Sequence, residues 1–193
     1  MEKLTSRKNE YIRALRRLSA EAQFRAERGE YICDGIKTLN EALAFGAAVT
    51  MVLWKERAQP VPGLSCAVQY AAGEELFDYA SPMKNSPGPV FTVKIPSEDT
   101  AVPIRRAIVL ESVQDPGNVG TVIRTANAFG IDAVILTGNC ADLYNPKTVR
   151  ATMGAIFRQR VLCRGVDELM PLLAENGLAL YGAALSARAA DIR

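Results

Sequence analysis

One glycine-containing segment between two apolar runs constrains the fold more than any other feature of this chain. It reads DPGNVGTVIRTANAFG from Asp115 to Gly130, and it separates the apolar runs Ala107–Glu111 and Ile131–Thr137. An apolar strand, a glycine-containing turn, a short helix and a second apolar strand form a βαβ unit. The segment therefore predicts two parallel strands joined by one helix.

The start of this helix is specified by turn residues. Pro116 and Gly117 favour a turn and Asn118 is a good helix cap, so we expect the helix over residues 118–129. Arg124 then falls on the second turn of an apolar helix, where packing alone does not require a charge. Two readings stay open for each residue. Asn118 is a plain cap or a substrate contact, and Arg124 is an ion-pair partner or a ligand-binding group.

Acidic partners for Arg124 lie close in the sequence. Glu111 and Asp115 flank the turn before the helix and could pair with the guanidinium. As turn-side carboxylates they could equally be solvated. The sequence leaves this choice open.

The rest of the second half repeats the strand–helix alternation. We expect further strands over Phe157–Leu162 and Leu178–Ala184, and helices over Pro146–Ile156 and Val166–Asn176. Single helices between strands predict a parallel sheet, whose functional loops gather at the carboxyl ends of the strands. These loops are Ser112–Gly117, Gly138–Tyr144 and the segment from Leu185 onward.

The first half predicts a smaller alternating α/β domain. One helix is expected over residues 6–28, with Ser6 as its cap. The further expected elements are strands at 30–33, 49–54, 67–70 and 90–95 and helices at 36–45 and 74–79. We therefore divide the chain into a domain over 1–97, a linker over 98–103 and a domain over 104–193.

Composition excludes several classes of chemistry. The chain has no histidine, which removes the commonest general base and metal ligand, and its four cysteines form no CxxC pair. Scattered thiols and a charged N-terminus favour a cytoplasmic protein, and no apolar stretch is long enough to span a membrane. We expect no metal and no membrane partner.

Positive charge is concentrated at the N-terminus. Residues 1–28 hold eight Lys/Arg and four Glu, whereas the whole chain carries a net charge of only +2. Such a basic helix is either a solvated face or a contact for phosphates. A dinucleotide-binding enzyme is disfavoured, because Gly117-Asn118-Val119-Gly120 does not match GxGxxG.

The motifs together resemble a known family. DPGNVGTVIRTANAFG and NPKTVRATMGAIFRQRV are similar to motifs 1 and 2 of the SpoU/TrmH branch of the SPOUT RNA 2′-O-ribose methyltransferases. The N-terminal stretches LTSRKNEYIRALRRL and ICDGIKTLNEAL resemble the family's substrate-binding domain, which is like ribosomal protein L30e. The fold implied is an L30e-like α/β domain followed by a partial parallel-sheet SPOUT domain without the knot-forming C-terminus, because the third motif is missing before Arg193.

The resemblance implies S-adenosylmethionine-dependent 2′-O-methylation of structured RNA, either rRNA or tRNA with rRNA favoured, by a homodimer. Arg124 and Asn118 would be the catalytic residues, and Ala183, Ala184 and Leu185 part of the cofactor pocket. The RNA-contact candidates are Arg7, Lys8, Arg13 and Lys84. We expect the chain to be a fragment of such an enzyme. The alternative is a non-catalytic RNA-binding protein derived from one by truncation.

Overall fold

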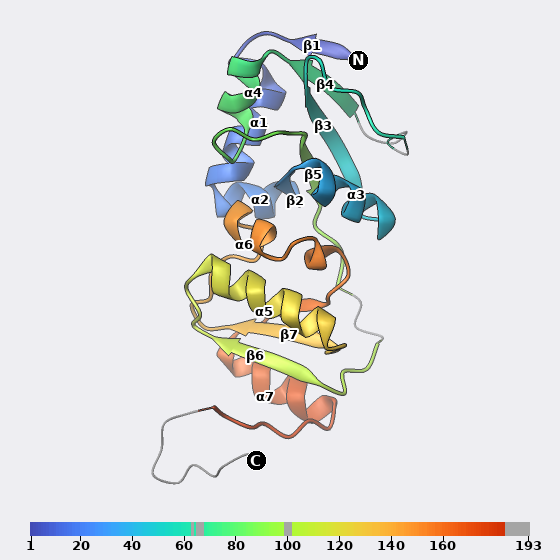
Figure 1. Cartoon of the computed structure of the whole chain (residues 1–193). Helices are drawn as coiled ribbons and strands as arrows, with labels where there is room; N and C mark the ends of the chain where they lie inside the picture. Colours follow the sequence, from blue (N-terminus) through green and yellow to red (C-terminus); the bar gives the residue numbers. More distant parts are fainter. Residues whose placement is uncertain (63, 65–67, 99–101, 184–193) are drawn as a thin grey trace.

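The chain folds into a mixed α/β structure with two separate sheets (Figure 1). The structure, a computed structural model, describes residues 1–62, 64, 68–98 and 102–183. The first sheet has five strands and lies in the first half of the sequence, and the second has three strands and lies in the second half. No helix in the described part of the chain is long and apolar enough to cross a membrane.

The five-stranded sheet has the order β1-β4-β3-β5-β2. Its strands are β1 (Glu2–Leu4), β2 (Glu30–Asp34), β3 (Val49–Lys55), β4 (Val68–Ala72) and β5 (Val90–Lys94). β5 runs antiparallel to both β2 and β3, whereas β1 and β3 pair with β4 in parallel. The short strand β1 was not expected from the sequence, because only Leu4 of its three residues is apolar and buried.

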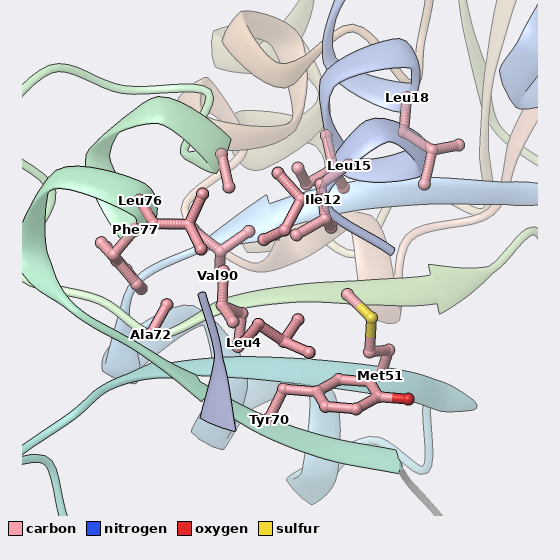
Figure 2. Packing of buried hydrophobic residues seen from close by; sticks show 13 residues of the cluster. Leu4, Ile12, Leu15, Leu18, Met51, Tyr70, Ala72, Leu76, Phe77 and Val90 are labelled. Carbon is pink, nitrogen blue, oxygen red and sulfur yellow. The ribbon is translucent and has the colours of Figure 1, made fainter. Parts of the chain in front are cut away.

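Helices cover both faces of this sheet. Side chains of α1 (Glu10–Ala20) and α4 (Glu74–Ala80) pack with Leu4, Met51 and Tyr70 on one face (Figure 2). On the other face, α3 (Ile36–Ala44) packs in a second cluster with Trp54 and Phe91.

The expected single helix over residues 6–28 is wrong in two respects. It begins at Glu10, where the side chain of Asn9 rather than Ser6 accepts a hydrogen bond as the cap, and it breaks at Glu21. The second piece, α2, covers Ala22–Arg28. The break places Arg25 inward, where its Nη1 donates to the carbonyl oxygen of Leu18 at 2.6 Å. Arg25 is only 3% exposed, so the basic segment is not one continuous solvated face.

The expected parallel sheet in the second half is confirmed. β6 (Ala107–Glu111), β7 (Ala133–Thr137) and β8 (Val161–Cys163) are paired in that order and all in parallel. The helix α5 (Pro116–Ala128) covers one face and α7 (Val166–Glu175) covers the other, while α6 (Pro146–Ala151) packs on α5 and β2 (Figure 1).

Several elements of the second half differ from expectation, and the strand expected over Phe157–Leu162 covers only Val161–Cys163. The helix expected to reach Ile156 ends at Ala151, and a turn with positive φ at Met153 and Gly154 leads into a 3₁₀ helix over Ala155–Phe157. A Cβ at Gly154 would lie 2.9 Å from Cγ of Glu41, so contact with the first half requires a glycine there. The residues 178–183 form no strand, and most of them are exposed.

The two halves are joined by a shared core and two buried or half-buried ion pairs. Val149, Tyr144 and Phe157 of the second half pack into the cluster on the α3 face of the first sheet, and the rings of Tyr31 and Tyr144 are 4.7 Å apart. Arg25 pairs with Asp142, and Arg158 pairs with Glu41. The arrangement fixes α6 against β2.

Replacing Gly120 with alanine is expected to destabilise the fold by about 1–3 kcal/mol, because α5 and α6 touch at this residue. A Cβ there would overlap Cβ of Ala151 and approach the backbone oxygen of Thr148 to 2.8 Å. Urea unfolding measures the loss. Thr121→Ala, at an exposed neighbour on the same helix, is the control and should stay within about 0.5 kcal/mol of the wild type. Equal effects of both substitutions would contradict the close packing.

Arg25→Ala is expected to cost about 1.5–3 kcal/mol of unfolding free energy, because it removes a buried guanidinium whose partner across the halves, Asp142, is half-buried. The matched control is Arg28→Ala, which removes an exposed pair with Glu30 and should cost no more than about 1 kcal/mol. Chemical denaturation of both variants provides the comparison. A loss no greater for Arg25→Ala than for Arg28→Ala would show that the buried pair does not hold the halves together.

Candidate functional site

The N-terminus of α5 begins two residues earlier than the sequence suggested. Asp115 is the cap, and its Oδ1 accepts a hydrogen bond from the backbone N–H of Asn118 at 2.7 Å. Pro116 occupies the first helical position, which proline favours because it has no N–H to leave unpaired. The expectation that Asn118 caps the helix is therefore wrong. Its exposed side chain, in the first turn, has no hydrogen-bond partner among the described residues.

Arg124 is exposed on the third turn of α5, because the helix begins at Pro116. Residues four apart lie on the same face of a helix, so Arg124 lies beside Gly120, which packs on α6. One turn further on, Asn127 accepts a hydrogen bond from Nε of Arg158 at 2.9 Å. Within residues 1–62, 64, 68–98 and 102–183, neither Glu111 nor Asp115 nor any other carboxylate forms an ion pair with Arg124. The guanidinium remains available to a ligand.

The loops at the carboxyl ends of β6 and β7 come together as expected. The backbone N–H of Ala141 donates to the oxygen of Val113 at 2.9 Å, and that of Ser112 donates to the oxygen of Thr137 at 3.1 Å. Beside them lies a cavity of about 440 Å³ at the ends of β7 and β8. Its lining includes Gly138, Cys140–Leu143 and Cys163–Val166.

This cavity has the size and polarity of a small-molecule subsite. Thr137, between two lining residues, has a buried Oγ1 that finds no hydrogen-bond partner in the described part of the chain. The cofactor candidates lie elsewhere in the chain: Ala183 is exposed at the end of the described residues, and Ala184 and Leu185 lie outside them.

No cluster of three or more His, Cys, Asp or Glu side chains suited to a metal ion occurs among the residues that the structure describes.

Most cations of the N-terminal helices are engaged within the protein. Arg7 pairs with Glu75 at 2.6 Å and lies over the ring of Tyr79, and Arg17 pairs with Glu21 at 2.8 Å. Of the predicted RNA contacts on this face, Lys8 and Arg13 are exposed and form no ion pair with a described residue.

Lys84, the fourth predicted RNA contact, lies at a different place. It lines a cleft of about 1010 Å³ between the first half and α6. Lys147 and Arg150 of α6 line the same cleft, and sequence reasoning did not assign them to RNA. The Asn-Pro-Lys sequence that starts α6 was the available signal, because it places Lys147 in the exposed first turn.

The cap at Asp115 gives a paired test on α5. Asp115→Ala is expected to lower the unfolding free energy by about 1 kcal/mol, because the first turn loses its side-chain acceptor. Asn118→Ala should change it by no more than about 0.5 kcal/mol, because its side chain is exposed and bonds nothing described. Thermal or urea unfolding of both variants distinguishes them. The reverse order of the two losses would restore Asn118 as the cap.

Comparisons with known proteins agree with this architecture. The family model described as "SpoU rRNA Methylase family" matches residues 105–193. A 23S rRNA guanosine 2′-O-methyltransferase of Bacillus subtilis is 30% identical over 96% of this chain and 74% of its own length. The chain spans between 50% and 74% of the lengths of this relative and of two further methyltransferase relatives.

Solved structures show the same fold. A putative RNA methyltransferase of the TrmH family from Porphyromonas gingivalis superposes with a TM-score of 0.75 and 29% identity, over 90% of this chain and 68% of that one. An AdoMet-bound rRNA methyltransferase from Sinorhizobium meliloti has a TM-score of 0.78 at 22% identity, over 90% of this chain and 68% of that one. From the sequence relatives and the family model, we conclude that the chain belongs to the SpoU rRNA methylase family.

Proposed function

We propose that the chain acts in S-adenosylmethionine-dependent methylation of the ribose 2′-hydroxyl of rRNA. The observation that carries this proposal is the exposed Arg124, a cation on the motif-1 helix with no ion pair among the described residues. The names of the Bacillus subtilis relative and of the AdoMet-bound Sinorhizobium structure support the reaction and the cofactor.

The reaction requires positioning and charge stabilisation more than a strong base. The chemistry that S-adenosylmethionine supplies when bound is an electrophilic methyl group. Arg124 keeps its proton, because a guanidinium is not deprotonated in proteins. It would bind the adjacent phosphate or the 2′-oxygen and stabilise the negative charge that develops there. Asn118, in the first turn of the same helix, would orient the ribose with its free amide.

The cavity at the ends of β7 and β8 would form one wall of the cofactor site. Gly138, Asp142 and Gly165 line it. Ala183, Ala184 and Leu185 are proposed to extend this wall.

We also propose that the two halves of the chain have different functions. Residues 1–97 would be an L30e-like domain that binds RNA, 98–103 a linker and 104–193 the methyltransferase domain, which would form a homodimer in the enzyme. The separate five-stranded and three-stranded sheets support this division.

Arg124→Ala is expected to lower the single-turnover rate of methyl transfer to rRNA by about 100-fold or more, with little change in melting temperature. The charge faces solvent and bonds nothing described, so the fold does not depend on it. Arg124→Lys should rescue poorly, because an ammonium lacks the planar fork of donors. The assay measures transfer of labelled methyl groups in a preparation in which the wild-type protein is active.

Thr121→Ala, at an exposed position on the same helix, is the control and should retain the wild-type rate. If Arg124→Ala lost rate and stability in proportion, Arg124 would be structural. If RNA bound normally and no preparation of the wild-type protein transferred methyl groups, the chain would be a non-catalytic RNA-binding protein.

A further inference from the structure

We propose that a single strand of RNA is held in the cleft between the two halves, with its phosphates bound by Lys84 from one wall and Lys147 from the other. This inference rests on the proposed function and names the surface through which the RNA is held. The cleft lies between the end of β2, the start of α3 and the loop 81–88 on one side and α6 on the other.

The charge inside the cleft is strongly unbalanced. Five cations line it, namely Lys37, Lys84, Lys147, Arg150 and Arg158, against the two carboxylates of Asp34 and Glu41. Glu41 is paired with Arg158. The other four cations, Lys37, Lys84, Lys147 and Arg150, are exposed and form no ion pair with a described residue.

Asp34 is occupied by hydrogen bonds within the protein. Its Oδ1 accepts from the hydroxyl of Ser86 at 2.8 Å and its Oδ2 accepts from the hydroxyl of Ser81 at 3.0 Å. Burial raises the pKa of this carboxyl, while the two serine hydrogen bonds lower it. The Asp34 carboxylate thus lines the cleft with both oxygens hydrogen-bonded to serines, and it forms no ion pair with a described cation of the cleft.

The same hydrogen bonds make the Lys84 wall a fixed structure. The Ser81 hydroxyl also accepts from the backbone N–H of Met83 at 3.1 Å, and the Ser86 hydroxyl accepts from that of Gly88 at 2.9 Å. Lys84 thus lies between two serines anchored to one carboxylate. A cation on a loop held in this way loses less conformational freedom when it binds a phosphate.

The opposite wall of the cleft, formed by α6, is also held in place by hydrogen bonding and packing. Asn145 caps α6, its Oδ1 accepting from the backbone N–H of Lys147 at 2.9 Å, and the helix packs against β2. Lys147 therefore projects from the first turn of a helix whose start is fixed by this hydrogen bond.

The size of the cleft selects a single strand. A volume of about 1010 Å³ lies at the upper end of the range for small-molecule sites, which admits a few nucleotides and excludes a duplex. Apolar side chains between the cations give unpaired bases a surface to lie on. These are Pro82, Met83, Pro87, Pro146 and Met153. Sequence-specific RNA recognition usually targets such unpaired loops.

The helix α1 is a weaker candidate for the main phosphate contact. On and just before this helix, Lys8 and Arg13 are exposed, whereas Arg7 and Arg17 are paired with carboxylates. The cleft offers four cations without such pairs, on two walls that face each other.

The test measures binding of a fluorescein-labelled oligouridine to the full chain by fluorescence anisotropy, with salt varied from about 50 to 200 mM. Each phosphate contact on a single strand contributes about 0.7 to the slope of log K against log salt. The double variant Lys84→Gln/Lys147→Gln should therefore reduce the slope by about 1.4. Lys94→Gln/Arg105→Gln removes the same charge from exposed residues outside the cleft lining and should leave the slope unchanged.

A second cleft pair, Lys37→Gln/Arg150→Gln, tests the same surface through different residues, and melting curves confirm that each variant is folded. A reduced slope in this pair supports the proposal even if the first variant is unstable. An unlabelled RNA duplex of equal length should compete poorly, and equal competition would overturn the single-strand assignment.

The outcomes separate this inference from the proposed function. If the wild type binds RNA, the cleft variants match it, and Lys8→Gln/Arg13→Gln weakens binding, the cleft assignment fails while the proposed function stands. If the wild type binds no RNA at low salt, both fail together.

Discussion

Asp142 is the residue on which the relation between the two halves depends. Its carboxylate binds the buried guanidinium of Arg25 from α2, and its Oδ1 also accepts from the backbone N–H of Tyr144 at 2.9 Å. Its backbone oxygen accepts from the hydroxyl of Thr148 on α6 at 2.9 Å. One residue therefore links the N-terminal helices, the loop after β7 and the helix that forms a wall of the charged cleft.

This arrangement places an ion pair where it is costly to break. Arg25 has given up its hydration, and its remaining N–H groups are satisfied by Asp142 and the oxygen of Leu18. Each of the three guanidinium nitrogens makes one hydrogen bond, and such a buried, bonded charge fixes geometry more than it adds stability. The geometry fixed here is the position of the loop 138–144, which lines the proposed cofactor cavity, relative to the first sheet.

The sequence predicted the parallel sheet and the helix of Arg124 because these depend on local patterns. The apolar runs before and after Asp115–Gly130 match β6 and β7 closely, and the turn residues mark the start of α5 within two positions. The cap was assigned to Asn118 because both Asn118 and Asp115 are good caps, and only the preference of proline for the first helical turn distinguishes them.

What the sequence did not predict depends on contacts between distant segments. The break at Glu21 accompanies the burial of Arg25 against Asp142, which lies 117 positions further on. The early end of α6 similarly accompanies the contact of Gly154 with Glu41. The sequence predicted Lys84 as an RNA contact because it lies in a proline-rich loop. Lys147 and Arg150 line the opposite wall of the same cleft, and no local sequence pattern reveals that cleft.

The shared core of the two halves has a consequence for how the protein can be divided. Tyr144, Val149 and Phe157 lie in the second half by sequence, yet they pack with Tyr31 and the α3 face of the first sheet. Cutting the chain between the halves would leave an apolar surface on each product. Such fragments would tend to reassociate or aggregate. The boundary in the sequence is thus not a boundary in the hydrophobic core, and the two halves are expected to fold as one unit.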